Sequence, residues 1–336
     1  MKDKIRIISL GMALIVLASA TLTGCSAGKN SGGERGTRNH KDQMAQLEDQ
    51  ELIDEDAPIE EQDPYALPES IFSVPDNYDV PLQDTVYGHT VKMNYFSSAT
   101  GKYRKADVLL PYDYDPTVQY PVLYLLHGLG GDNTSWGGMN VEYIIDNLNF
   151  TDNIPEMIVV CPNTVALPRI TDDMSEAELL VGFDSFIDDL RGSLMPFINK
   201  NFSVRKDRDG TAIAGYSYGA REALYIGFAM QETFGYIGAF SPTSGVVPGV
   251  NEDYDTPTLL DEFYVDPDIG DYHLILMDVG TYDEDDCINA TAFYGQYFDA
   301  LGIDYISYYV DGGHDPGVWM NGLYNFVKRL FLNPEE

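Results

Sequence analysis

The feature of this sequence that most restricts its fold is an alternation of short apolar runs with amphipathic stretches, which starts near residue 85 and continues toward the C-terminus. Short continuous apolar runs are typical of strands buried on both faces. They occur at 122–126, 157–160, 211–214, 237–240, 274–279 and 305–310. Amphipathic stretches of helical length lie between them, at 141–148, 183–200, 220–230, 286–301 and 317–330. This order predicts an α/β fold with a mostly parallel sheet and helices on both faces.

Two earlier stretches have a different pattern. Residues 86–96 and 105–110 alternate apolar and polar side chains, which predicts an antiparallel pair of strands at the entry to the sheet. We find no internal repeat in the sequence. Residues 85–336 are therefore expected to form one catalytic-sized domain.

The charge of the chain excludes two classes of partner. It has 20 Lys and Arg against 54 Asp and Glu, a formal net charge of −34, while 44% of its residues are hydrophobic. That apolar content is too high for a disordered protein. Nucleic acids and anionic membrane surfaces attract positively charged proteins, so neither is an expected partner.

The N-terminus reads as an export signal. Residues 1–25 begin with Lys2, Lys4 and Arg6, continue with an apolar run at 7–20, and end in Leu-Thr-Gly-Cys. This ending resembles a bacterial lipobox, which implies that Cys25 is lipidated. We expect an exported lipoprotein, anchored to the cell membrane with its domain outside the cytoplasm. The alternative is an ordinary signal peptide in which the cysteine has no such role.

Residues 26–84 are expected to form a tether. The first part is rich in Gly, Ser, Asn and Gln, and acidic residues then recur from Asp42 to Asp63 without a basic one. The alternative for its last part is docking on the domain through Ile71, Phe72, Val74 and Tyr78.

A Gly-x-Ser-x-Gly sequence joins the expected strand at 211–214 to the expected helix at 220–230. In the order strand, turn and helix this is a nucleophile elbow, which exposes its serine at the carboxyl edge of the sheet. Gly215 and Gly219 suit the turn, because the backbones come too close for a Cβ atom. Ser217 is therefore the candidate nucleophile.

A serine hydroxyl needs a neighbouring base, and the chain has five histidines. His314 follows the last expected strand, so it lies at the same sheet edge as Ser217. His40, His89 and His273 lie in the tether, the entry strands and the start of a strand. His314 is the candidate base, and the alternative is a capping residue before the last helix.

An acid should orient that base from a loop between the serine and the histidine. The loop after the expected strand at 274–279 contains Asp283, Asp285 and Asp286, and composition alone does not choose among them. Two other readings of this acidic loop are a calcium site and helix N-capping.

The oxyanion of a tetrahedral intermediate needs two donors. One is the backbone N–H of Tyr218, the residue after the candidate nucleophile. The loop His-Gly-Leu-Gly-Gly at 127–131 follows the expected strand at 122–126 and suits the second donor, for which Leu129 N–H is our choice. The alternative is a glycine-rich turn with no such role.

Taken together, residues 85–332 resemble the esterase D family and, within it, the feruloyl and acetyl-xylan esterases of carbohydrate esterase family 1. The matching stretches are 123–128, 161–164, 212–217, 280–283 and 312–315 with Val318 and Trp319. The resemblance implies an α/β-hydrolase fold, Asp283 as the acid because it follows Gly-Thr-x, and oxyanion donors at Leu129 and Tyr218. It implies no cofactor and no metal.

The chain departs from this family in two places. Tyr218 stands where the family often has Met, which keeps the backbone donor and changes the acyl pocket. Residues 165–182 match no part of the pattern, and we expect them to form a lid or rim over the site.

The expected function is a serine carboxylic-ester hydrolase that acts on acyl or feruloyl esters of a cell-wall polysaccharide or oligosaccharide. Contact with the membrane is expected through the lipid anchor only. The alternatives are S-formylglutathione hydrolase-like activity, acyl transfer, or a non-catalytic polysaccharide-binding lipoprotein. Cys161 and Cys287 are expected to be unpaired buried thiols.

Overall fold

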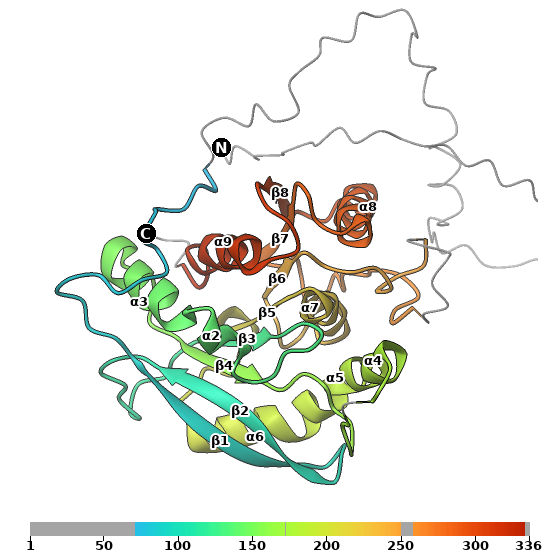
Figure 1. The fold of residues 1–336 in the computed structure, drawn as a ribbon. Helices are drawn as coiled ribbons and strands as arrows, with labels where there is room; N and C mark the ends of the chain where they lie inside the picture. Colours follow the sequence, from blue (N-terminus) through green and yellow to red (C-terminus); the bar gives the residue numbers. More distant parts are fainter. Residues whose placement is uncertain (1–70, 172, 250–257, 333–336) are drawn as a thin grey trace, which may run out of the picture. The chain divides into compact units, whose positions relative to one another are not determined.

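The computed structural model describes residues 71–171, 173–249 and 258–332, in which eight strands form one sheet (Figure 1). The strands are β1 (His89–Ser97), β2 (Lys102–Leu110), β3 (Val122–Leu126), β4 (Ile158–Pro162), β5 (Thr211–Tyr216), β6 (Tyr236–Phe240), β7 (Leu274–Gly280) and β8 (Ile306–Val310). Their order is β1-β2-β4-β3-β5-β6-β7-β8. β1 and β2 are antiparallel to their neighbours, and β3 to β8 run parallel.

Helices cover both faces of the sheet. They are α2 (Ser135–Gly138), α3 (Val141–Asp152), α4 (Glu176–Asp184), α5 (Phe186–Asp189), α6 (Met195–Asn201), α7 (Tyr218–Ala229), α8 (Asp285–Leu301) and α9 (Pro316–Val327). Figure 1 shows α3 and α9 on one face and α7 and α8 on the other. Each face has its own cluster of buried apolar side chains. This confirms the predicted α/β class, with a mostly parallel sheet between two helical layers.

The central strands are buried along their whole length. Every residue of β3, β4, β5 and β6 is buried, because a helical layer covers each face. Their sequences are therefore continuous apolar runs and do not alternate with polar residues. A parallel sheet built this way brings the loops after β3, β5, β7 and β8 to one edge.

The helix expected at 183–200 differs in the structure. Helical residues begin at Glu176, and a π-helical turn at Leu190–Leu194 separates α5 from α6. Ser175 starts α4 with a capping box, since its Oγ accepts from Glu178 N–H while the Glu178 carboxylate accepts from Ser175 N–H. This start lies within the acidic stretch that was expected to form a rim, so it differs from the prediction.

The domain also begins earlier than residue 85. The ring of Phe72 stacks on Tyr308 with centroids 4.1 Å apart, and its carbonyl accepts from Asn325 Nδ2 at 2.8 Å. Tyr78 packs edge-on against Tyr324 at 5.5 Å. Residues 72–84 thus follow the docking alternative, and the boundary expected at 84 is wrong for this stretch.

The predicted signal segment, Cys25 and the tether up to residue 70 lie outside the described residues. Among the residues that are described, no helix has both the length and the apolar character that a membrane crossing requires.

The docked N-terminal segment predicts a stability effect. Phe72→Ala should lower the free energy of unfolding by about 3 kcal/mol, because it removes a buried ring from between Tyr308 and Arg329. Ile71→Ala is the control: that side chain is 62% exposed, and its loss should change stability by less than about 0.5 kcal/mol. Urea unfolding measures both, and equal values for the two variants would contradict docking through Phe72.

Candidate active site

Ser217 lies in the sharp turn between β5 and α7. Its φ of 56° and ψ of −127° are a strained backbone conformation for a residue with a side chain. A Cβ atom on Gly215 would lie 2.4 Å from the carbonyl oxygen of Gly219, and one on Gly219 would lie 2.5 Å from that of His127. Both positions therefore require glycine, and the turn projects Ser217 from the carboxyl edge of the sheet.

The structure brings Ser217, His314 and Asp283 together although they come from three separate loops. The Nε2 atom of His314 lies 3.0 Å from Ser217 Oγ, and its Nδ1 atom lies 2.7 Å from Asp283 Oδ1. The three side chains form a continuous chain of hydrogen bonds. Such an arrangement can transfer the serine proton to the imidazole while the carboxylate holds the ring.

The other two acidic candidates lie elsewhere. Asp285 is the first residue of α8, and the Asp286 carboxylate accepts from the N–H of Ser244 at 3.1 Å. Of the three aspartates that the sequence left open, Asp283 is the one beside His314.

Several donors hold Asp283 in its charged form. Its Oδ2 accepts from Ser241 Oγ at 2.7 Å and from Gly280 N–H at 3.2 Å, and its Oδ1 accepts from Glu284 N–H at 2.8 Å. Burial alone would raise the Asp283 pKa, but the hydrogen bonds from His314, Ser241 and Glu284 lower it below its usual value. Ser241 was not among the predicted site residues, although it directly follows the buried strand β6 and so lies at the site edge.

The pKa of His314 is shifted in the opposite direction, upward. Burial would lower its pKa, but the hydrogen bond and negative charge of Asp283, with the charges of Glu284 and Asp315, raise it above the usual value. The ring of Trp319 meets the imidazole edge-on at 5.1 Å and stacks on Tyr216 at 4.2 Å. The orientation of the His314 ring is thus fixed by both charge and packing.

The loop after β3 packs directly against Ser217, the candidate nucleophile. A Cβ atom on Gly128 would lie 2.9 Å from that of Ser217. His127 is buried; its Nδ1 donates to Gly128 O at 2.7 Å, and its Nε2 accepts from Thr164 N–H at 2.8 Å. Burial lowers the His127 pKa to about 4, so the ring is neutral and joins this loop to the one after β4. His127 was not among the predicted site residues.

The two predicted oxyanion donors belong to this neighbourhood. Leu129 follows Gly128 in the loop against Ser217, and Tyr218 N–H opens α7. Neither amide donates to a protein acceptor within the described part of the chain. The positive end of the α7 dipole adds to the same region.

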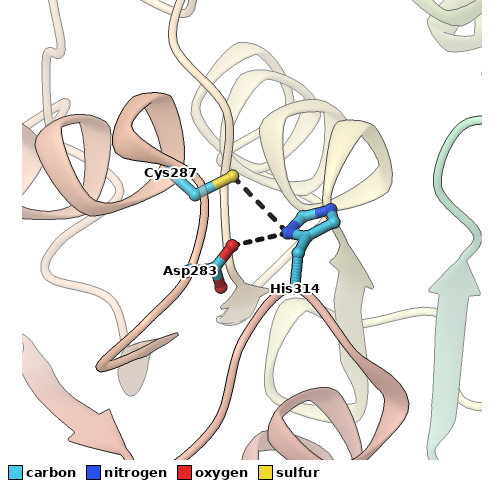
Figure 2. A group of neighbouring side chains, drawn as sticks. All are labelled: Asp283, Cys287 and His314. Carbon is cyan, nitrogen blue, oxygen red and sulfur yellow. Dashed lines mark hydrogen bonds and ion pairs between the residues drawn. The ribbon is translucent and has the colours of Figure 1, made fainter.

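One further side chain adjoins the site. The Sγ atom of Cys287 lies 3.7 Å from His314 Nδ1, and Figure 2 shows the thiol and the Asp283 carboxylate facing the same imidazole nitrogen. Among the described residues these three form the group close enough to bind a metal ion. One thiol and one imidazole are poor ligands for calcium, so the calcium reading of the acidic loop gains no support. Cys161 and Cys287 are both free and buried, as predicted.

The helical end of the expected rim is joined to α7, the helix that follows Ser217. Tyr218 OH donates to the Glu176 carboxylate at the start of α4. The buried guanidinium of Arg221 pairs with Asp184 and with Glu222, each at 2.6 Å. The expected rim at 165–182 thus contacts the site through its helical end, and buried charges on α7 hold it there.

The contact between Asp283 and His314 predicts a titration. Asp283→Asn should lower the His314 pKa, because a partly buried imidazolium loses its adjacent negative charge. The control is Asp285→Asn, which removes a charge that has no part in the shift of His314. NMR of the imidazole C2–H signal measures both. An equal fall in the two variants would show that the general acidity of the loop raises this pKa, and not the contact with Asp283.

The chain was compared with known proteins. The profile of a family described as putative esterase matches residues 97–325. The chain is 34% identical over 166 residues to an endo-1,4-beta-xylanase/feruloyl esterase of Xylanibacter ruminicola, covering 47% of this chain and 22% of that protein. It is 25% identical over 184 residues to endo-1,4-beta-xylanase Y of Acetivibrio thermocellus, covering 51% and 15%. This chain therefore spans less than a quarter of either relative.

The similarity to one solved structure covers a larger share of both chains. A CE1 ferulic acid esterase from Anaeromyces mucronatus, in complex with ferulic acid, matches with a TM-score of 0.71 and 32% identity, over 77% of this chain and 97% of that one. The resemblance drawn from the motifs is thereby confirmed. Since both the family profile and this structure cover most of the folded domain, the chain belongs to the putative esterase family, as an α/β-hydrolase related to the CE1 feruloyl esterases.

Proposed function

We propose that this chain is a serine esterase that releases acyl or feruloyl groups from a cell-wall polysaccharide, with Ser217, His314 and Asp283 as its catalytic residues. The observation that supports it most directly is the continuous hydrogen-bond chain from Ser217 Oγ through the imidazole to Asp283. The substrate class rests on the relatives, since two of them are described as feruloyl or ferulic acid esterases.

The reaction follows from the positions of these groups. Ser217 Oγ attacks the ester carbonyl carbon while its proton passes to His314 Nε2. The carbonyl oxygen becomes an oxyanion, for which Leu129 N–H and Tyr218 N–H are the proposed donors. The imidazolium then gives its proton to the leaving sugar alcohol, which leaves an acyl-enzyme.

Water completes the cycle. His314 takes a proton from a water molecule as its oxygen attacks the acyl carbon, and the imidazolium returns that proton to Ser217 as the acid departs. Asp283 stays ionised and stabilises the imidazolium in both halves, consistent with its lowered pKa. The intact relay favours catalysis over a non-catalytic binding role.

Substitution of the nucleophile tests the proposal. Ser217→Ala should lower kcat/KM for methyl ferulate and for p-nitrophenyl acetate by about 10⁴-fold or more, because no acyl-enzyme can form. Equal rates for Ser217→Ala and the unsubstituted chain would refute the esterase assignment. Activity of the unsubstituted chain on the acetate alone would remove the feruloyl part. Product analysis with a competing alcohol separates hydrolysis from acyl transfer.

We also propose that the protein is anchored to the cell membrane. Cys25 ends a segment that resembles a lipobox, and we expect acyl chains on this residue to hold the domain near the outer face of the cell membrane. The expressed full chain should enter the detergent phase on phase partitioning, and Cys25→Ser should move it to the aqueous phase. An aqueous unsubstituted chain would contradict lipidation.

A further inference from the structure

A second surface feature lies at the same sheet edge as the active site. It is a groove of about 410 Å³ formed by the start of β2, the loop after β3 and the loop after β4. Its lining includes Asp132 and Asn133 from the first loop and residues 167–170 from the second. We call it the β2–β4 groove.

The β2–β4 groove is positively charged in a strongly acidic chain. Four of the 20 basic residues line it: Lys102, Arg104, Lys105 and Arg169. No carboxylate of the described residues lies within ion-pair distance of Lys102, Lys105 or Arg169, and all three are exposed. The acid of the groove, Asp132, already accepts from the backbone N–H and the hydroxyl of Thr134.

The fourth cation of the groove, Arg104, differs from the other three. Arg104 is buried, its Nε lies 2.7 Å from Asp189 Oδ2, and its other nitrogens donate to the carbonyls of Val165 and Asn163. These contacts hold the loop after β4 against β2. The groove therefore has one fixed and paired cation and three exposed ones, of which Lys105 also contributes to lowering the pKa of Asp132.

The rest of the lining suits a sugar. The ring of Tyr103 is 76% exposed and is held by an edge contact with Phe96 at 5.5 Å. Exposed aromatic faces pack against the apolar faces of sugar rings, and the amides of Asn133 and Asn163 supply polar groups beside it. Cations together with an aromatic ring point to a sugar that bears a carboxylate.

The groove and the nucleophile lie close enough to share one glycan. β4, β3 and β5 are neighbours in the sheet, so the loop after β4 is two strand spacings, about 10 Å, from β5, the strand that precedes Ser217. The hydrogen bond from Thr164 N–H to His127 joins the groove's loop to the loop against Ser217. A glycan esterified at the site can reach the groove with a nearby sugar.

We infer that the β2–β4 groove binds a uronic acid residue of the same polysaccharide whose ester occupies the active site. This rests on the proposed function and narrows its substrate to acidic glycans. The net charge of −34 does not oppose it at contact distance, because physiological salt screens charges beyond about 8 Å.

Binding to the inactive Ser217→Ala chain tests the inference, since no ester is then turned over. Calorimetry compares a xylo-oligosaccharide bearing one glucuronic acid with a neutral xylo-oligosaccharide of the same backbone length. We expect the acidic compound to bind about tenfold more tightly than the neutral one. Adding both Lys105→Glu and Arg169→Glu to the Ser217→Ala chain should abolish that preference. The double substitution Lys105→Gln and Arg169→Gln should weaken the preference for the acidic compound. It replaces the double glutamate variant if that variant does not fold.

The matched control is Lys200→Glu with Lys206→Glu, which makes the same charge change at exposed positions outside the groove and should keep the preference. Equal affinity for the two compounds, binding of neither, or an equal loss in the control pair would each overturn the inference. Hydrolysis of methyl ferulate by the unsubstituted chain tests the proposed function separately, so the two failures are distinguishable.

Discussion

The active site depends on one tight crossing, where β5 turns into α7 beneath the loop that follows β3. The turn places Ser217 at a φ of 56° and leaves no space for side chains at Gly215 and Gly219. Its backbone N–H donates to Phe240 O at 2.9 Å, which ties the strained residue to β6. The packed strands and helices on either side hold a conformation that an isolated segment would relax.

The charge of each carboxyl group at the site depends on the hydrogen-bond donors around it and on its burial. Asp283 receives hydrogen bonds from Ser241, Gly280, Glu284 and His314, so it is charged. Asp278, five residues earlier and fully buried, has no partner for either carboxylate oxygen in the described structure. Burial and the charge of Asp283 raise its pKa well above the usual value, which favours its neutral form. Two carboxyl groups of one strand and loop thus differ because burial dominates at Asp278, while side-chain and backbone donors surround Asp283.

Sequence reasoning reached Ser217 and His314 from local signals. The Gly-x-Ser-x-Gly turn is encoded by neighbouring residues, and a histidine after the last strand of a parallel sheet lies at the edge of the serine by topology. The choice among Asp283, Asp285 and Asp286 was beyond composition, because all three occupy one loop. A contact with His314, which is distant in sequence, distinguishes them. Phe72 lay within the expected tether, with docking on the domain as the alternative. Its stacking on Tyr308 assigns it to the domain.

By itself, the sequence determined the order of strands and helices, the class of fold, and which loops share the carboxyl edge. These are consequences of periodicity and of turns, which a short stretch of chain encodes. Only the tertiary structure decided which aspartate meets the base, how Arg221 joins the rim to α7, and which lysines and arginines gather in the β2–β4 groove. Each of these depends on contacts between residues far apart in the chain, and the order of residues along the chain does not specify such distances.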